Sequence, residues 1–344
     1  MMRKARRLLK RALLGPTDTA QKFHIGLRDP QSEVDVWLHG WGDRIDVTHR
    51  HLMACGAPLT IGIGFESGQI ESVKSYRRPI LRFHEHAGEQ RLLGEIGLHV
   101  DDRFRVGTHE ICLFHVTDYS NHCLPWLRLR MHYLLHERTR RQSKDDVRIT
   151  SRDSLAMIVF YLCPRPIALV TVGDLDVGNL FPMNLMGPIG GDYFAFALNS
   201  NRAAPLVERA RTIVLSTVPL EQASLVSSLG KNHRKASIDW SKLPFPTIRP
   251  RNIDAPVPSF ALSACEMQIE ELRHLGSHTL FVAKKLAEER LADGPQLFLA
   301  HGMYKAWLRH SKRTVDCGTE GGGSTVTIGQ HRLPALPGDG TQMR

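Results

Sequence analysis

Apolar and polar residues alternate along much of the first third of the chain. The segment LTIGIGF (59–65) alternates and is followed by a turn at Ser67-Gly68, and LLGEIGLHVDDRFRVGTHEICLFHV (92–116) contains further short alternating runs separated by polar turns. Strict alternation is typical of strands with one buried face. Residues 23–118 are therefore predicted to be mostly β.

A helical pattern follows this β region and then gives way to charge. Leu127, Met131, Leu134 and Leu135 have helical spacing, and residues 136–148 form a charged run that we interpret as a domain boundary. We find no internal repeat. The predicted division is a basic N-terminal arm (1–22), a mostly-β domain of no recognised family (23–148), a second domain (149–310) and a disordered tail (311–344).

The second domain again shows strand patterns with short helices between them. Strands are predicted at 166–172, 192–198, 212–218, 259–272, 278–286 and 296–308, and helices at the start of 204–219 and at 224–230, the latter ending at Gly230. The segment GNLFPMNLMGPIGG (178–191) is apolar but interrupted by glycine and proline, so it is predicted to be an irregular loop. This succession favours a β-barrel over a doubly wound sheet.

Charge and cysteine usage narrow the class of protein. The net charge of +10 favours anionic partners such as nucleotides or acidic membranes, but no nucleic-acid-binding motif accompanies it, so nucleic acid is not expected. The basic start, MMRKARRLLKRALLG, fits either a solvated helix or a helix that contacts a membrane surface. No segment has the length of a transmembrane helix. Six widely spaced cysteines favour reduced thiols and a cytoplasmic location.

Several polar residues interrupt the apolar pattern of the second domain. Asn199, Ser200, Asn201 and Arg202 leave a buried strand just before a helix that Pro205 helps to start, which suits a phosphate site or, equally, an exposed polar turn.

Three other groups of polar residues each have two interpretations. Lys231 lies in a basic helix end that either interacts with the helix dipole or contacts a nucleotide phosphate. His278, at a strand start, is either structural or part of a site. His132 and His136 share a helical face, but no third metal ligand can be placed, and no metal site is predicted.

The order of motifs in the second domain carries a family resemblance. Pro166–Thr171, Asn179–Met183 and Asn199–Arg202, followed by IDWSKLPF (238–245) and LGSHTLFVAKKL (275–286), together resemble the flavin reductase-like domain family. The resemblance covers residues 154–310 approximately. It implies a mainly β fold, an FMN-binding split β-barrel with short helices, here preceded by the unrecognised mostly-β domain.

The resemblance also implies a cofactor, an activity and roles for individual residues. FMN would be the cofactor and NADH or NADPH the hydride donor, with electrons passing to free flavin, a ferric complex or a partner monooxygenase. Such proteins are usually homodimers with the flavin near the subunit interface. The alternative is a non-catalytic flavin-binding or regulatory module.

The residues that this resemblance assigns fall into two groups. His278 would flank the nicotinamide as the catalytic-site residue. The cofactor contacts would be Thr171, Asn179, Pro182, Met183, Asn184, Leu185, Asn199, Ser200, Asn201, Arg202 and Lys231. The family often has threonine where Ala204 stands, which removes one hydroxyl from the expected phosphate site.

Overall fold

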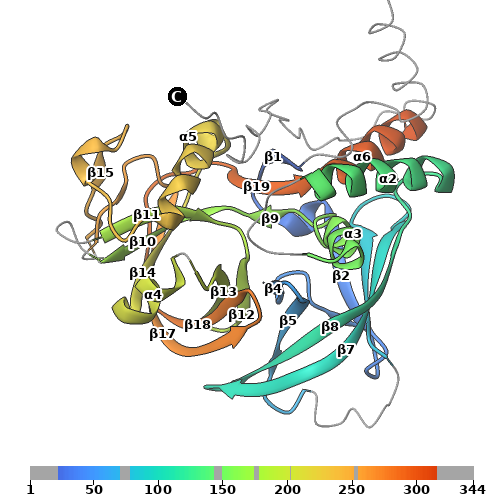
Figure 1. The fold of residues 1–344 in the computed structure, drawn as a ribbon, viewed down its shortest axis with the longest axis horizontal. Coiled ribbons are helices and arrows are strands. Elements are labelled where there is room, and N and C mark those ends of the chain that lie inside the picture. Colours follow the sequence, from blue (N-terminus) through green and yellow to red (C-terminus); the bar gives the residue numbers. More distant parts are fainter. Residues whose placement is uncertain are drawn as a thin grey trace, which may run out of the picture.

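Two seven-stranded antiparallel sheets form the body of the molecule and lie side by side (Figure 1). The computed structural model describes residues 22–69, 78–142, 149–173, 178–201, 203–251 and 255–315. We call the first sheet and its connections the N-half (34–121) and the second the C-half (168–290). The mainly β class predicted from sequence is confirmed.

The N-half sheet has the strand order β3-β2-β6-β7-β8-β5-β4. Its strands are β2 (Val34–His39), β3 (Ile45–Asp46), β4 (His51–Gly56), β5 (Leu59–Glu66), β6 (Ile80–Glu85), β7 (Leu92–Val106) and β8 (His109–Asn121).

The C-half sheet has the order β11-β10-β14-β17-β18-β13-β12. Its strands are β10 (Ala168–Gly173), β11 (Gly178–Met183), β12 (Met186–Gly190), β13 (Tyr193–Asn199), β14 (Thr212–Thr217), β17 (Ser263–Leu275) and β18 (His278–Arg290). The sheet curls around its own apolar core, and α4 (Ala204–Ala210) contributes Ala204 and Val207 to that core. This is the split-barrel architecture expected from sequence.

The two sheets have the same topology, which corrects the prediction that the chain contains no repeat. Each N-half strand has a C-half counterpart in the same chain order and at the same place in the sheet. The counterparts are β2 and β10, β3 and β11, β4 and β12, β5 and β13, β6 and β14, β7 and β17, and β8 and β18. The fold is therefore duplicated within one chain.

The long hairpins β7–β8 and β17–β18 also repeat each other residue by residue. Val106 pairs with His109 across one turn, and Leu275 pairs with His278 across the other. Both hairpins then have irregularities at corresponding positions, where the pairing skips Asp101 and Thr117 in the first and Glu270 and Leu286 in the second. Because bulges are specific features of a fold, their coincidence supports the duplication.

The halves pack on each other reciprocally. Strand β4 contacts β13, and its counterpart β12 contacts β5. The apolar core between them is formed by Leu52, Ala54, Phe104, Val106, Ile111 and Leu113 of the N-half with Ile189, Ala195, Leu280 and Val282 of the C-half. An interface in which each side uses the same elements has the character of a two-fold symmetric dimer.

The remaining elements tie the halves together. A three-stranded sheet joins β1 (Lys22–Leu27), β19 (Gln296–His301) and β9 (Arg165–Pro166), so the first described strand pairs with the last, across the predicted domain division. The other elements are β15 (Thr247–Ile248), β16 (Val257–Pro258), α2 (Trp126–Gln142), α3 (Ser151–Phe160), α5 (Ala223–Ser228) and α6 (Gly302–Val315), with 3-10 turns at Pro30–Ser32, Leu220–Gln222, Leu229–Arg234 and Trp240–Lys242.

Helix α3 packs on the N-half sheet. Its N-terminus is capped by the Thr150 side chain, which accepts a hydrogen bond from the Asp153 amide. It packs against β7 and β8, where Gly94 leaves room for Val159; a side chain at position 94 would come within 2.8 Å of Val159 Cγ1. This helix lies within the predicted second domain but packs on the first half.

Four element boundaries differ from the sequence predictions. Helix α2 continues to Gln142, into the charged run. Helix α5 passes into a 3-10 turn that ends at Arg234 rather than stopping at Gly230. The last strand ends at His301 and α6 follows to Val315, into the predicted tail. The sequence pattern is ambiguous here because a short buried segment can fit both the helical period of 3.6 residues and the strand period of 2.

The segment 178–191 was expected to be irregular, and this prediction was wrong. It contains β11 and β12, which are the two edge strands of the C-half sheet. Proline is tolerated in an edge strand because one side of the strand needs no donor for the ladder. Pro182 and Pro188 therefore interrupt no central hydrogen bonding.

No helix within the described ranges is long and apolar enough to cross a membrane. The basic arm up to residue 21 and the tail from residue 316 lie outside the described residues.

Candidate functional site

The loop after β13 joins the turn of the β17–β18 hairpin. The Ser200 amide donates to the Ser277 carbonyl at 3.1 Å, and the Ser200 and Thr279 hydroxyl oxygens lie 3.2 Å apart. The Asn199 side chain accepts a hydrogen bond from the Asn201 amide at 3.0 Å. The Ser200 hydroxyl and the Asn199 carboxamide therefore lie where a buried strand reaches the surface, next to the buried Thr279 hydroxyl.

His278 lies beside this loop, at the junction of the two halves. It pairs with Asn199 in the sheet. Its Nδ1 lies 2.8 Å from the Ser277 hydroxyl, 3.4 Å from the Gly56 amide and 3.8 Å from Cys55 Sγ. The ring is partly buried and is positioned by groups from both halves, which the sequence pattern did not reveal.

The β4–β5 turn of the N-half covers the hairpin turn. The Ser277 amide donates to the Ala57 carbonyl at 3.1 Å. Gly276 has φ of +51°, and a Cβ there would lie 2.5 Å from the Ala57 carbonyl oxygen. Glycine is needed at this position both for its left-handed conformation and for the close approach of the N-half backbone.

Asn184 and Leu185 also belong to this region. The Leu185 carbonyl accepts a hydrogen bond from the Ala197 amide at 2.8 Å, which places the β11–β12 connection beside the end of β13. The Asn184 side chain donates to the Tyr161 hydroxyl at 3.2 Å. Six of the sequence-predicted residues (Asn184, Leu185, Asn199, Ser200, Asn201 and His278) are thus brought together.

Two predicted contacts have structural roles instead. Asn179 is fully buried, donates to the Asn232 and Lys235 carbonyls at 3.0 and 2.8 Å, and accepts from the Leu180 amide. Thr171 is buried and donates to the Pro256 carbonyl at 3.1 Å. Because their polar groups are satisfied by the protein, neither fits a cofactor contact.

The other predicted contacts are dispersed. Met183 packs in the C-half core, and the Pro182 carbonyl accepts a hydrogen bond from His233 Nε2 at 2.7 Å. Lys231 is exposed on the 3-10 turn that follows α5. Arg202 lies outside the described residues. Helix α4 begins with Pro205 in its first turn, as predicted, but has only seven residues, too few for a strong dipole.

His132 and His136, which share a helical face, are engaged in packing. His132 is 2% exposed, and His136 Nε2 lies 2.7 Å from the Ser154 hydroxyl of α3. The pair therefore anchors α2 near α3.

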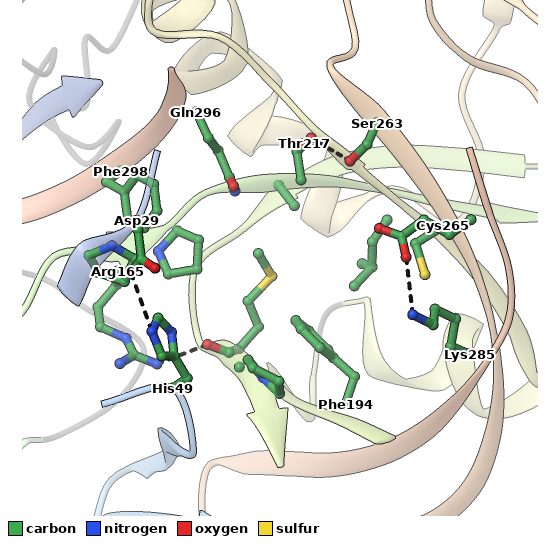
Figure 2. A pocket seen from close by; sticks show the side chains of 18 of the residues that line it. Asp29, His49, Arg165, Phe194, Thr217, Ser263, Cys265, Lys285, Gln296 and Phe298 are labelled. Carbon is green, nitrogen blue, oxygen red and sulfur yellow. Dashed lines mark hydrogen bonds and ion pairs between the residues drawn. The ribbon is translucent and has the colours of Figure 1, made fainter. Parts of the chain in front are cut away.

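A pocket of about 370 Å³ opens at the other end of the C-half barrel (Figure 2). Phe194, Leu215, Met267, Thr217, Ser263 and Lys285 are among its lining residues, and none of the sequence-predicted site residues lines it. Its charged groups are largely paired, because Lys285 contacts Glu288 at 3.1 Å and Asp192 at 3.7 Å. The pocket thus offers mixed polarity rather than a concentrated positive charge.

Arg165, at the edge of this pocket, links the two halves. It donates from Nη2 to the His51 carbonyl at 2.7 Å and to the Met186 carbonyl at 3.0 Å, and from Nη1 to His51 Nε2 at 3.1 Å. His51 and Met186 occupy corresponding positions in the two sheets. Burial, reinforced by the Arg165 guanidinium, lowers the pKa of His51 well below its usual value.

Comparison with known proteins agrees with the fold of the C-half. Residues 160–308 match the family described as flavin reductase like domain. This part of the chain is therefore a flavin reductase-like domain, as its motifs indicated. No curated protein matches the sequence.

Solved structures of similar fold cover less than half of this chain. An FMN-binding protein from Thermus thermophilus is 25% identical over 40% of this chain and 82% of its own, with a TM-score of 0.35. The NADH:FAD oxidoreductase of Streptomyces globisporus is 15% identical over 46% of this chain and 95% of its own, with a TM-score of 0.40. The styrene monooxygenase flavin reductase of Pseudomonas putida is 19% identical over 43% of this chain and 92% of its own, with a TM-score of 0.35. At these TM-scores the likenesses carry no information on this chain's ligand.

Proposed function

We propose that the C-half binds FMN at the Asn199–Asn201 loop and acts as a flavin reductase that takes hydride from NADH or NADPH. The observation that carries the proposal is the convergence of this loop with the Ser277–Thr279 turn inside a flavin reductase-like domain. The electrons would pass to free flavin, a ferric complex or a partner monooxygenase.

The residues present fit the phosphate end of FMN. The Ser200 hydroxyl and the Asn199 and Asn201 carboxamides are small neutral groups able to donate to phosphate oxygens, and the sequence continues with Arg202. The buried Thr279 hydroxyl would hold Ser200 in place rather than contact the phosphate. The chain's net charge of +10 favours attraction of a phosphate dianion.

The ring end of the cofactor would rely on fewer side chains than the family resemblance implies. Asn184 and Leu185 lie beside the loop, whereas Thr171 and Asn179 are occupied by protein carbonyls. When bound, FMN supplies the two-electron chemistry that no side chain provides. The protein's own contribution is to hold, orient and partly enclose it.

His278 would orient the nicotinamide at this site. Its ring is fixed by the Ser277 hydroxyl and by the Gly56 amide of the N-half, which limits the directions in which it can face. Precise placement of reacting groups is a large source of rate enhancement. His278 is therefore assigned to positioning rather than to proton transfer.

A non-catalytic flavin-binding module is the second candidate. The observation favouring it is that the β4–β5 turn of the N-half covers the hairpin turn beside His278, which restricts access from that side. The two functions differ in whether a nicotinamide reaches the bound flavin.

The visible spectrum of the protein after addition of FMN and desalting tests both candidates. Retained bands near ~370 and ~450 nm that bleach under anaerobic NADH or NADPH would support the reductase. Retained bands that neither nicotinamide bleaches would support the module. If flavin is washed out, NAD(P)H oxidation with excess FMN decides between the candidates. A protein that neither retains flavin nor oxidises NAD(P)H would refute the proposal.

Arg202→Ala examines the assignment of the phosphate loop. Loss of a charge-assisted hydrogen bond costs about 1.5–3 kcal/mol, so FMN should bind about 10- to 100-fold more weakly. Quenching of flavin fluorescence measures the affinity, and an unchanged affinity would contradict the assignment.

A further inference from the structure

The duplicated fold places a second loop and histidine at a position equivalent to the candidate site. In the N-half, the Ser67 amide donates to the Thr108 carbonyl at 3.1 Å, as the Ser200 amide does to Ser277 in the C-half. His109 Nδ1 lies 3.2 Å from the Thr108 hydroxyl, and His278 Nδ1 lies 2.8 Å from the Ser277 hydroxyl. The framework of the candidate site is therefore present twice in one chain.

The two equivalent sites differ in charge. Glu66 pairs with His109 in the sheet, the place that Asn199 takes opposite His278. Glu110 occupies the position of Thr279, where it is buried and held by Arg103. Two carboxylates thus replace a carboxamide and a hydroxyl.

These carboxylates make the N-half loop unsuitable for a phosphate. Glu66 is paired with Arg50 at 3.1 Å, and Glu110 with Arg103. A phosphate dianion placed there would lie beside both carboxylates and compete with them for these arginines, which opposes binding. Three residues after Glu66 the sequence has Gln69, whereas three residues after Asn199 it has Arg202.

The turns that each half extends toward the other also differ. The β4–β5 hairpin is one residue pair, Gly56 and Leu59, longer than the β12–β13 hairpin, and through Ala57 it bonds to the C-half hairpin turn. The shorter hairpin presents Gly190 and Gly191 to His109, and a Cβ at Gly190 would lie 2.4 Å from that ring. The N-half thus extends over the C-half site. The β12–β13 turn of the C-half only packs closely against His109.

Residues near the pseudo-two-fold axis show that the arrangement is internal to the chain. Phe104 and Arg273 occupy corresponding hairpin positions, and the Arg273 guanidinium lies over the Phe104 ring, 4.2 Å from its centroid. Arg165 binds the carbonyls of the corresponding residues His51 and Met186. The C-half surface that would meet a second copy is thus already covered by the N-half.

From these observations we infer that the N-half takes the place of a second subunit, and that the chain has one phosphate-bearing ligand site, in the C-half, completed by the Cys55–Pro58 turn. The inference rests on the proposed FMN function for the identity of the ligand. It replaces the homodimer suggested by the sequence with an internal pseudo-dimer in which one site has lost its binding chemistry.

Matched substitutions in the two halves test the inference. FMN is titrated into the full chain at low salt, and both the affinity and the number of sites are measured. Asn199→Glu introduces the N-half carboxylate into the C-half loop and should weaken binding about 10-fold or more. The control, Glu66→Asn, makes the reciprocal change in the N-half and should leave affinity and site number unchanged.

A third variant tests whether the N-half completes the site. Pro58 is exposed on the turn next to Gly276. Pro58→Glu should weaken FMN binding by about 5-fold at low salt, and the loss should shrink at high salt because it arises from charge. An unchanged affinity would remove the N-half from the site. Thermal unfolding of each variant verifies that it is folded.

The outcomes separate this inference from the proposed function. One flavin per chain, lost with Asn199→Glu but not with Glu66→Asn, is the expected result. Two flavins per chain, or weakening by Glu66→Asn, would overturn the one-site inference while leaving the function intact. No flavin binding by the unmodified chain would overturn the proposed function and the one-site inference with it.

Discussion

Individual buried residues determine how the halves of this molecule join. Arg165 is 4% exposed, and the residues that accept its hydrogen bonds come from β4 and β12. Burial lowers the pKa of its guanidinium. Arginine side chains stay protonated in proteins. The side chain therefore serves as a buried donor to two carbonyls.

Arg165→Met should consequently destabilise the protein. The substitution leaves the His51 and Met186 carbonyls without a donor but also removes a buried charge, for a net loss of about 2 kcal/mol. Arg44→Met, which removes an exposed guanidinium stacked on Trp37, should cost no more than about 1 kcal/mol. Urea unfolding measures both, and equal effects would contradict the role given to Arg165.

Two buried histidines make the stability depend on pH. Burial lowers the pKa of His301 to about 3 and lowers that of His51 well below its usual value. Below about pH 6.5 the unfolded chain binds protons at these rings that the folded chain does not. Each should therefore lower the unfolding free energy by about 1.4 kcal/mol per pH unit as the pH falls from 6.5 toward the folded pKa.

Unfolding curves at pH 7.5, 6.5 and 5.5 measure this effect. His301→Asn keeps an acceptor for the Met303 amide, which now donates to His301 Nδ1 at 3.2 Å. The variant should lose part of the slope below pH 6.5 whatever its absolute stability. A slope identical to that of the unmodified protein would show that His301 titrates normally.

At the scale of elements, strand β5 docks on β12 through a glycine. A Cβ at Gly64 would lie 2.3 Å from the Ile189 carbonyl oxygen, whereas a Cβ at Gly62 would meet the flexible Leu52 side chain at 3.1 Å. Both glycines lie in the same strand. Comparing substitutions at Gly64 and Gly62 therefore separates the cost of disturbing the packing between the halves from the general cost of replacing a glycine in a strand.

Gly64→Ala should therefore be the more damaging of two matched substitutions. Forcing the backbones of β5 and β12 apart costs about 1–3 kcal/mol, whereas Gly62→Ala should cost less than about 1 kcal/mol because Leu52 can move. Thermal unfolding compares the two variants. A larger loss for Gly62→Ala would contradict the described packing of β5 on β12.

Much of the C-half was predictable from its residues. The strands at 166–172 and 192–198 and the loop at 199–201 follow from alternation and turn chemistry, which act locally. Segment 178–191 was mispredicted because proline and glycine are compatible with strands at a sheet edge, and sequence does not state which strands are edges. Asn179 was misassigned because its partners, Asn232 and Lys235, are distant in sequence.

At the scale of the whole molecule, duplication is the feature that local patterns did not disclose. The only visible signal was the similarity of Val106-Gly107-Thr108-His109 to Leu275-Gly276-Ser277-His278. Glycine at both turns has positive φ, +56° and +51°, so the shared residue reflects shared geometry. The N-half contribution to the candidate site depends on long-range packing and could be found only in the structure.

The flavin content and molar mass of a single chromatographic peak test the account most directly. The protein is loaded with FMN, and absorbance and light scattering are recorded together as it elutes. The account predicts one flavin per chain in a particle of one chain, 38.7 kDa before cofactor. Two flavins per chain, or a particle of two chains, would contradict it.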